Sequence, residues 1–152
     1  MTLEALFKGR MVDISGMMAR LREVAKAEGL PFGERNMTYN SRLAQELGKW
    51  AETQGKVAVY NQAVFQAYFA DGRNIGEIDE LVGVAASADL DPKEAKKVLE
   101  ERPFKRAVDA DWERSKQMGI RAVPTFVMDD RMLAGAQPYA ALEEFVTAGK
   151  ER

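Results

Sequence analysis

The sequence predicts an α/β fold that is mostly helical and carries one antiparallel hairpin near its C-terminal end. Apolar residues recur every three or four positions over most of residues 14–118, as in amphipathic helices. After Gly119 the pattern changes to a short β-prone run, a turn and a second apolar run. The length of 152 residues is that of one ordinary domain. We therefore expect a single domain over residues 1–152.

Six helices are predicted before the hairpin, each from its own apolar stripe. Their ends are expected at Gly29, at Gly55, near Asp89, at Arg102-Pro103 and at Gly119. The inward positions, in chain order, are Ile14, Met17, Met18, Leu21, Val24 and Ala25; Leu43, Ala44, Leu47, Trp50 and Ala51; Val57, Tyr60, Val64, Ala67 and Tyr68, widened by Phe65 and Phe69; Ile78, Leu81, Val82 and Ala85; Ala95, Val98 and Leu99; and Phe104, Ala107, Val108 and Trp112.

Two helix starts carry polar residues of the capping type. Asp91 is expected to cap a helix that has Pro92 at its first position. Asn40 and Ser41 stand before the stripe that begins at Leu43, so a cap is the favoured interpretation there too. The alternative is that Asn40, Ser41 and Arg42 line a cleft.

The hairpin is predicted from Thr125–Met128 and Met132–Ala134, joined by a turn at 129–131. A last helix should start at Gln137-Pro138, with Leu142, Phe145 and Val146 inward and Gly149 past its end. Because a lone hairpin is marginal in water, it must lean on the helices or extend a sheet formed elsewhere.

The composition excludes several kinds of chemistry. The chain has no cysteine and no histidine, so it offers no thiol nucleophile, no thiolate metal site and no serine–histidine pair. We therefore assign no catalytic residue, no metal site and no cofactor. A net charge of −2 gives no field that would gather nucleic acid or an anionic membrane. No stretch could span a bilayer and no signal peptide is evident at the start, so a cytoplasmic protein is expected.

Three clusters have both a structural and a functional interpretation. The aromatic residues Trp50, Tyr60, Tyr68 and Phe69 are expected in the core, with a substrate groove as the alternative. Methionines at 11, 17 and 18 are interpreted mainly as core filling rather than a binding face. A solvated surface, rather than a metal site, is expected for the carboxylates of Glu77, Asp79, Glu80, Asp89, Asp91 and Glu94.

A resemblance to a known family rests on several segments together. The stretch from Gly119 to Val127, with Val123-Pro124 entering a strand, is followed by the hairpin and then by Gly135-Ala136-Gln137-Pro138. Upstream, the segments 40–44, 65–69 and 71–75 continue the match. This combination resembles the DsbA family of thioredoxin-like proteins, and within it the FrnE-type cytoplasmic oxidoreductases.

The resemblance implies a thioredoxin-like fold with a large helical insert. The insert would occupy about residues 1–118, and the C-terminal half of the thioredoxin fold about residues 119–152. The first strand–helix–strand unit of the family, which carries its Cys-x-x-Cys motif, has no counterpart in this sequence. We therefore expect a truncated form that is inactive by itself.

The resemblance also implies a site and a reaction. Val123-Pro124 would be a cis-proline loop, in which Val123, with Pro124 and Ala122, binds a thiol- or disulfide-containing protein during dithiol–disulfide exchange. In a second interpretation the loop binds glutathione, as in hydroxychromene-carboxylate isomerases or kappa-class transferases. In a third, the chain is a non-catalytic binding or assembly module.

The missing unit should also leave apolar surface uncovered. One edge of the hairpin from Thr125 to Ala136 is expected to be exposed, together with some of Phe126, Met128 and Leu133, and surfaces of this kind are usually buried by association. A homodimer is therefore expected, formed by pairing of the hairpins or by the N-terminal helix of one copy filling the gap in the other.

Overall fold

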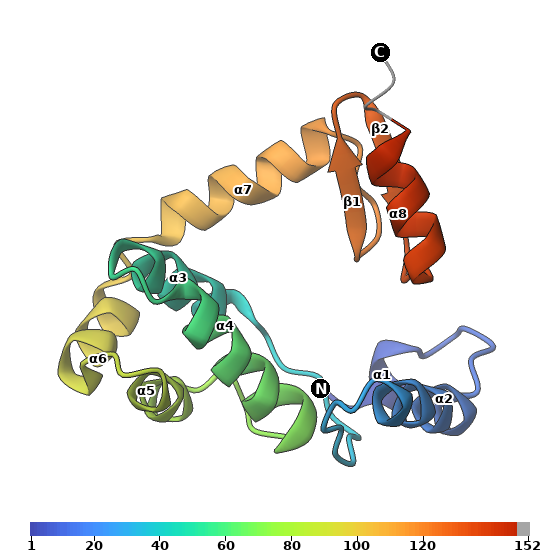
Figure 1. The fold of residues 1–152 in the computed structure, drawn as a ribbon. Coiled ribbons are helices and arrows are strands. Elements are labelled where there is room, and N and C mark those ends of the chain that lie inside the picture. The colour runs from blue at the N-terminus through green and yellow to red at the C-terminus, as the bar shows by residue number, and fades with distance from the viewer. Residues whose placement is uncertain (149–152) are drawn as a thin grey trace. The chain divides into compact units, whose positions relative to one another are not determined.

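The computed structural model describes residues 1–148, and the chain divides into two compact units, Met1–Val108 and Asp109–Arg152. The first unit contains only helices, while the second holds a hairpin and the last helix (Figure 1). The elements are α1 (Leu3–Leu6), α2 (Ile14–Ala27), α3 (Arg42–Thr53), α4 (Val57–Phe65), the π-helix η1 (Gln66–Ala70), α5 (Ile78–Ser87), α6 (Pro92–Glu101), α7 (Lys105–Gln117), β1 (Thr125–Met128), β2 (Arg131–Ala134) and α8 (Tyr139–Thr147).

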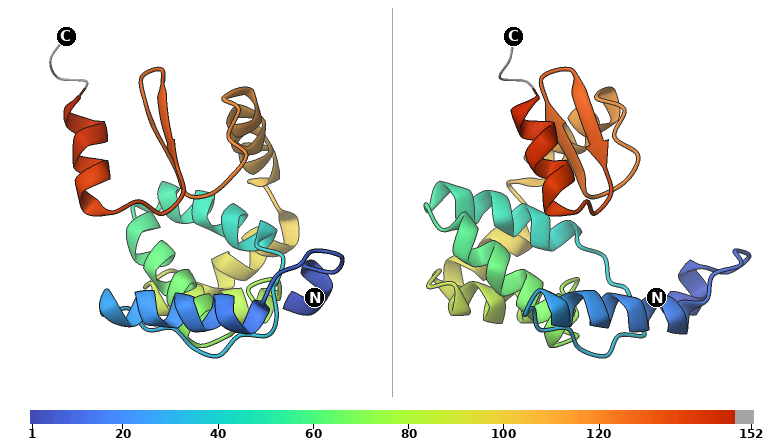
Figure 2. Two further views of the ribbon diagram at one scale, coloured as in Figure 1. Left: turned by 90° about the vertical axis from the view of Figure 1, so that its right-hand side faces the viewer. Right: turned by 45° about the vertical axis from the view of Figure 1, so that its right-hand side comes forward.

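The core of the first unit lies between α3, α4, α5 and α6, which Figure 2 shows from two sides. Leu47, Tyr60, Leu81 and Leu99 contribute one large, fully buried side chain from each of these helices. The stripes predicted for these helices are therefore largely confirmed. The hydroxyl of Tyr60 donates to the carbonyl of Ala44 at 2.9 Å, so the phenol is buried with its polar atom satisfied.

The loop between α2 and α3 is held tightly against η1. The N–H of Gly33 donates to the carbonyl of Phe69 at 2.9 Å, and a Cβ at residue 33 would overlap the carbonyl of Ala70. The guanidinium of Arg35 donates to the hydroxyl of Tyr68 and lies 4.1 Å from the centre of its ring. The π-helix itself was not expected, because its apolar spacing continues that of α4.

Several predicted inward positions of this unit are wrong. On α2, Met18 and Ala25 are buried but Leu21 and Val24 are 43% and 54% exposed, because only one edge of the helix packs against described residues. Phe65 on α4 is 60% exposed, since it lies on the side away from the core residues Tyr60 and Val64. Met11 lies outside any helix and is fully exposed, so its interpretation as core filling is also wrong.

The second unit is a small hairpin that lies between the C-terminal part of α7 and α8 (Figure 2). The two strands pair antiparallel, with Thr125 opposite Ala134 and Met128 opposite Arg131. Arg131 was predicted to belong to the turn, but it is a residue of β2 that pairs with Met128. The register places Phe126, Met128 and Leu133 on one face of the hairpin.

The second unit has little interior of its own. None of the described residues 109–148 is buried, and Phe126 is exposed, while Met128 and Leu133 are half-buried. Trp112 on α7 and Val146 on α8 are exposed and not inward, because a two-stranded sheet is too narrow to cover a helix on each side. The predicted helix end at Gly149 lies outside the described residues.

Candidate substrate-binding loop

The loop that leads from α7 into β1 holds the three predicted site residues, Ala122, Val123 and Pro124. It begins where the N–H of Ile120 donates to the carbonyl of Ser115 at 3.0 Å and closes the end of α7. The Val123-Pro124 peptide bond is cis, the isomer that the resemblance implies. The structure thus brings the predicted residues together on one short segment next to a strand.

Hydrogen bonds on both sides of Val123 fix the shape of this loop. The Thr125 hydroxyl donates to the carbonyl of Ala122 at 2.7 Å, and the N–H of Gly135 donates to the carbonyl of Pro124 at 2.8 Å. These two contacts tie the loop to its own strand and to the residue after β2. The backbone around Val123 is therefore held in place by its neighbours.

Val123 itself is presented to solvent. It is 90% exposed, and its backbone N–H and C=O have no hydrogen-bond partner among residues 1–148. A free backbone donor and acceptor on one residue beside a strand can pair with the backbone of an extended peptide. The loop carries no thiol, carboxylate or imidazole side chain.

The strongest ionic cluster is in the first unit and has a structural role. Glu46 is 2% exposed, and its carboxylate accepts from Arg42 Nε and from Arg102 Nη2, both at 2.8 Å. The hydrogen bonds from Arg102 hold the pKa of Glu46 below its ordinary value, against the opposing effect of burial. Arg42 also donates to the carbonyl of Lys105 at 2.9 Å, so the cluster joins α3 to the start of α7.

The cap predicted at the start of α3 is present only in part, because the N-cap residue Ser41 makes no side-chain cap hydrogen bond and Asn40, one residue earlier, bonds the first N–H of the helix. The Asn40 side-chain oxygen accepts from the N–H of Arg42 at 2.9 Å, whereas the Ser41 hydroxyl accepts from Gln45 Nε2 at 2.9 Å instead. Asp91 accepts from the N–H groups of Lys93 and Glu94 at 2.8 and 2.9 Å, as a helix cap does. These residues have local roles, and Arg42 belongs to the Glu46 cluster rather than to a cleft.

The carboxylates near α5 and α6 pair with nearby cations. Glu80 accepts from Arg73 Nε at 2.6 Å, and Asp79 lies 3.7 Å from Lys96 Nζ. Within the part of the chain that the structure describes, no group of three or more acidic side chains is placed to hold a metal ion. No helix in that part is long and apolar enough to cross a membrane.

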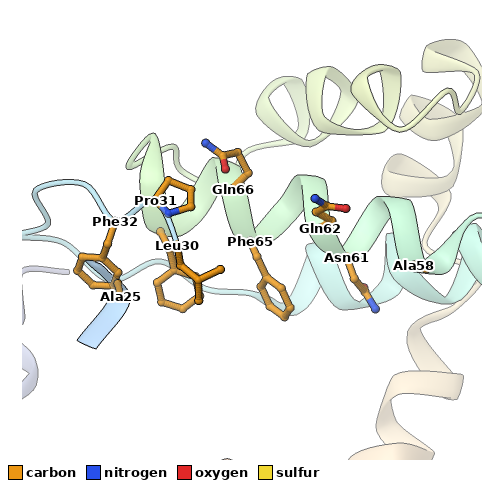
Figure 3. Close-up of a pocket in the computed structure, with 10 residues that line it drawn as sticks. Ala25, Leu30, Pro31, Phe32, Ala58, Asn61, Gln62, Phe65 and Gln66 are labelled. Atoms are coloured by element: carbon orange, nitrogen blue, oxygen red, sulfur yellow. The ribbon is translucent and has the colours of Figure 1, made fainter. Parts of the chain in front are cut away.

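The aromatic residues divide between core and groove. Trp50 and Tyr60 are buried in the core as predicted, whereas Phe69 is half-buried and lines an open groove of about 570 Å³ beside α4 (Figure 3). Leu30, Pro31 and Phe32 form the other wall of this groove, and this apolar run after Gly29 was not predicted to line a site although it is visible in the sequence. We call this recess the α4 groove, lined by Ala25, Leu30, Pro31, Phe32, Ala58, Asn61, Gln62, Phe65, Gln66 and Phe69.

Comparison with known proteins identifies the fold. The family model described as DSBA-like thioredoxin domain matches residues 5–147. A solved structure, described as a probable DsbA oxidoreductase from Streptomyces coelicolor, is 29% identical with a TM-score of 0.83 and covers 90% of this chain and 61% of its own. A protein disulfide isomerase candidate from Nitrosomonas europaea shares the fold at 16% identity, with a TM-score of 0.70, covering 90% of this chain and 73% of its own.

One curated relative extends the comparison. The uncharacterized protein YwbO of Bacillus subtilis (strain 168) is 34% identical over 109 residues, which cover 69% of this chain and 53% of YwbO. The chain thus spans about half the length of this relative. The predicted DsbA-type thioredoxin fold is confirmed, and the match extends over both units. This chain belongs to the DsbA-like thioredoxin domain family, whose solved members include proteins described as oxidoreductases.

Proposed function

We propose that this chain carries the substrate-binding loop of a DsbA-type disulfide oxidoreductase, with Ala122, Val123 and Pro124 as the contact residues. The observation that supports this most directly is the exposed, unpaired backbone of Val123 in a loop whose shape is fixed on both sides. The proposed ligand is an extended segment of a thiol- or disulfide-containing protein. The FrnE-type subclass is part of the same proposal.

The reacting thiols have to come from outside this sequence. Thiol–disulfide exchange needs a thiolate that attacks a disulfide sulfur, and the chain contains no cysteine. Its own contribution is to hold the substrate backbone by strand-like pairing. We therefore expect the purified chain to leave the rate of insulin reduction by dithiothreitol unchanged, as followed by turbidity.

Two substitutions at one position test the backbone contact. Val123→Pro removes the N–H donor, whereas Val123→Ala keeps it and removes only side-chain atoms. The probe is a fluorescent, extended peptide that contains one alkylated cysteine, and binding is followed by anisotropy. We expect Val123→Ala to bind within about threefold of the parent chain and Val123→Pro to bind at least about tenfold more weakly, since tenfold corresponds to ~1.4 kcal/mol, about one hydrogen bond.

Circular dichroism would establish that both variants keep their helices. Equal binding by Val123→Pro and the parent chain would overturn the backbone contact, and no peptide binding at ~1 mM would overturn the function. Binding of glutathione without binding of the peptide would favour a glutathione-dependent relative instead.

A further inference from the structure

The α4 groove is an apolar recess of the first unit, and no charged side chain is among the ten residues that line it. Its floor is aromatic, because the ring of Phe69 lies 6.1 Å from that of Phe32 and 6.2 Å from that of Phe65. Figure 3 shows Asn61 and Phe65 on the side of α4 that faces Leu30. Leu30 and Phe65 are both strongly exposed, so the groove is open to an apolar occupant.

The same unit also exposes the kind of helix that fits such a groove. Met17, Leu21 and Val24 stand on α2 at positions i, i+4 and i+7, which is the spacing by which an amphipathic helix enters an apolar groove. Met17 is half-buried, and Leu21 and Val24 are exposed. The stripe is therefore largely uncovered in the single chain.

The stripe is short enough to fit within the groove. At about 1.5 Å per residue, the stripe from Met17 to Val24 is roughly 10 Å long, and the wall of the groove from Ala58 to Phe69 is roughly 17 Å long. The two surfaces also adjoin, because Ala25 lines the groove and is the i+4 neighbour of Leu21. One continuous apolar surface thus contains both a projecting helix face and a recess.

We propose that the occupant of the α4 groove is α2 of a second copy of this chain, in a two-fold dimer. A surface that carries both parts of a contact is self-complementary, so a two-fold axis makes the contact twice. In this dimer Leu21 and Val24 of one copy lie against Phe65 and Phe69 of the other.

The charge of the chain is compatible with this contact. The groove is lined by apolar and amide side chains only, so it offers no partner to a charged segment. The formal net charge of −2 adds little repulsion between two copies. This dimer differs from the two arrangements expected from the sequence, because it uses neither the hairpin nor a gap left by absent strands.

Paired substitutions test the contact by sedimentation velocity at several concentrations up to ~100 μM. Leu21→Asp and Phe65→Lys should each raise the dimer dissociation constant at least tenfold. A mixture of the two variants should form one-to-one dimers, because that pair has one unchanged contact and one contact between Asp and Lys. Val59→Asp is the matched control, since Val59 is 51% exposed on α4 but does not line the groove, and it should leave the dimer intact.

A monomeric parent chain at ~100 μM would overturn the proposal, as would dimers that survive both substitutions. Folded variants that do not pair in the mixture would also overturn it. If either charged variant loses its helical circular dichroism, disulfide trapping decides the question. An equal mixture of Leu21→Cys and Phe65→Cys chains should form a crosslinked heterodimer on oxidation, whereas Leu21→Cys with Val59→Cys should not, and failure of the first crosslink would refute the contact.

Discussion

Glu46 is the residue on which the packing of α3 against the C-terminal end of α6 depends most. Its carboxylate is almost completely buried and accepts hydrogen bonds from two arginines, one of them 56 positions away in the chain. Arg102 reaches it from a left-handed backbone conformation, with φ of 54°, at the end of α6. Removing the carboxylate charge would leave two guanidinium groups without their shared partner.

We predict that Glu46→Gln destabilises the chain by about 2 kcal/mol at neutral pH, less than the ~3–5 kcal/mol of a broken buried ion pair, because both arginines are partly exposed. Glu52→Gln is the control on the same helix, since Glu52 is exposed, and should change stability by less than about 0.5 kcal/mol. Urea unfolding measures both differences. A loss no larger than that of the control would contradict the role given to Glu46.

The lowered pKa of Glu46 predicts how the stability of the chain depends on pH. The pKa of Glu46 is lowered in the folded chain from its ordinary value of 4.5, so the unfolded chain binds this proton first as the pH falls. Its stabilising effect is complete above about pH 4.5 and is lost as the pH falls through the lower pKa of the folded state. The stability difference between the parent chain and Glu46→Gln should shrink over this range, and a difference that stays constant down to pH 3 would contradict the prediction.

For single residues, the sequence predicts contacts with near neighbours in the chain far better than contacts with distant residues. The hydrogen bonds that Asn40 and Asp91 make to N–H groups at helix starts were predictable, because their partners lie two or three residues away. Glu46 was not singled out, because a glutamate beside an apolar stripe ordinarily faces solvent and its partner Arg102 is remote in the sequence. The exposure of Val123 was implied only by the family resemblance.

Among the elements, the π-helix η1 and the loop before α3 form the tightest junction. Gly33 lies so close to the carbonyl of Ala70 that no side chain fits there without a backbone shift. By contrast, a Cβ at Gly48 in α3 would meet the ring of Tyr60 at 3.5 Å, an ordinary contact distance. Alanine at Gly48 can therefore serve as the control for alanine at Gly33.

We predict opposite effects of alanine at these positions. Gly33→Ala should cost about 1–3 kcal/mol through overpacking, while Gly48→Ala should be neutral or stabilise by up to about 1 kcal/mol through helix propensity. Urea melts of the two variants against the parent chain give both values. A Gly33→Ala chain as stable as the parent would mean that the loop is not held against η1.

Element positions were easier to predict than element burial. The predicted starts and ends of α3, α5 and α6 agree with the structure, because each stripe is bounded by a cap, a glycine or a proline. The direction of the apolar faces was less predictable. On α2 and α8 the stripe is present, but Val24 and Val146 remain exposed, since periodicity shows that a helix is amphipathic without showing what covers it.

In the chain as a whole, the two units differ in how their structure is supported. The first has a core of fully buried side chains, whereas none of the described residues 109–148 is buried. A two-stranded sheet of this kind is marginal without further strands or packing. The fold class was nonetheless predictable, because the resemblance extended over both units.

Hydrogen exchange should therefore separate the two units. Amides in the middle of α3 and α5 are expected to exchange only through global unfolding, while the paired amides of β1 and β2 exchange at least about a hundredfold faster through local opening. Mass spectrometry of peptides from each unit measures this difference. Equal protection of the hairpin and the α3–α5 core would contradict this difference in stability between the two units.

An NMR titration of the ¹⁵N-labelled chain with a cysteine-alkylated extended peptide shows whether the loop at Val123 binds a peptide backbone. We predict saturable shifts of the amide signals of Ala122, Val123 and Thr125, together with Gly135, whose N–H is bonded to the loop. The amides of the α3–α6 core should not shift. Saturable shifts confined to the first unit, or no shifts in the loop at saturating peptide, would contradict the assignment of the substrate-binding site.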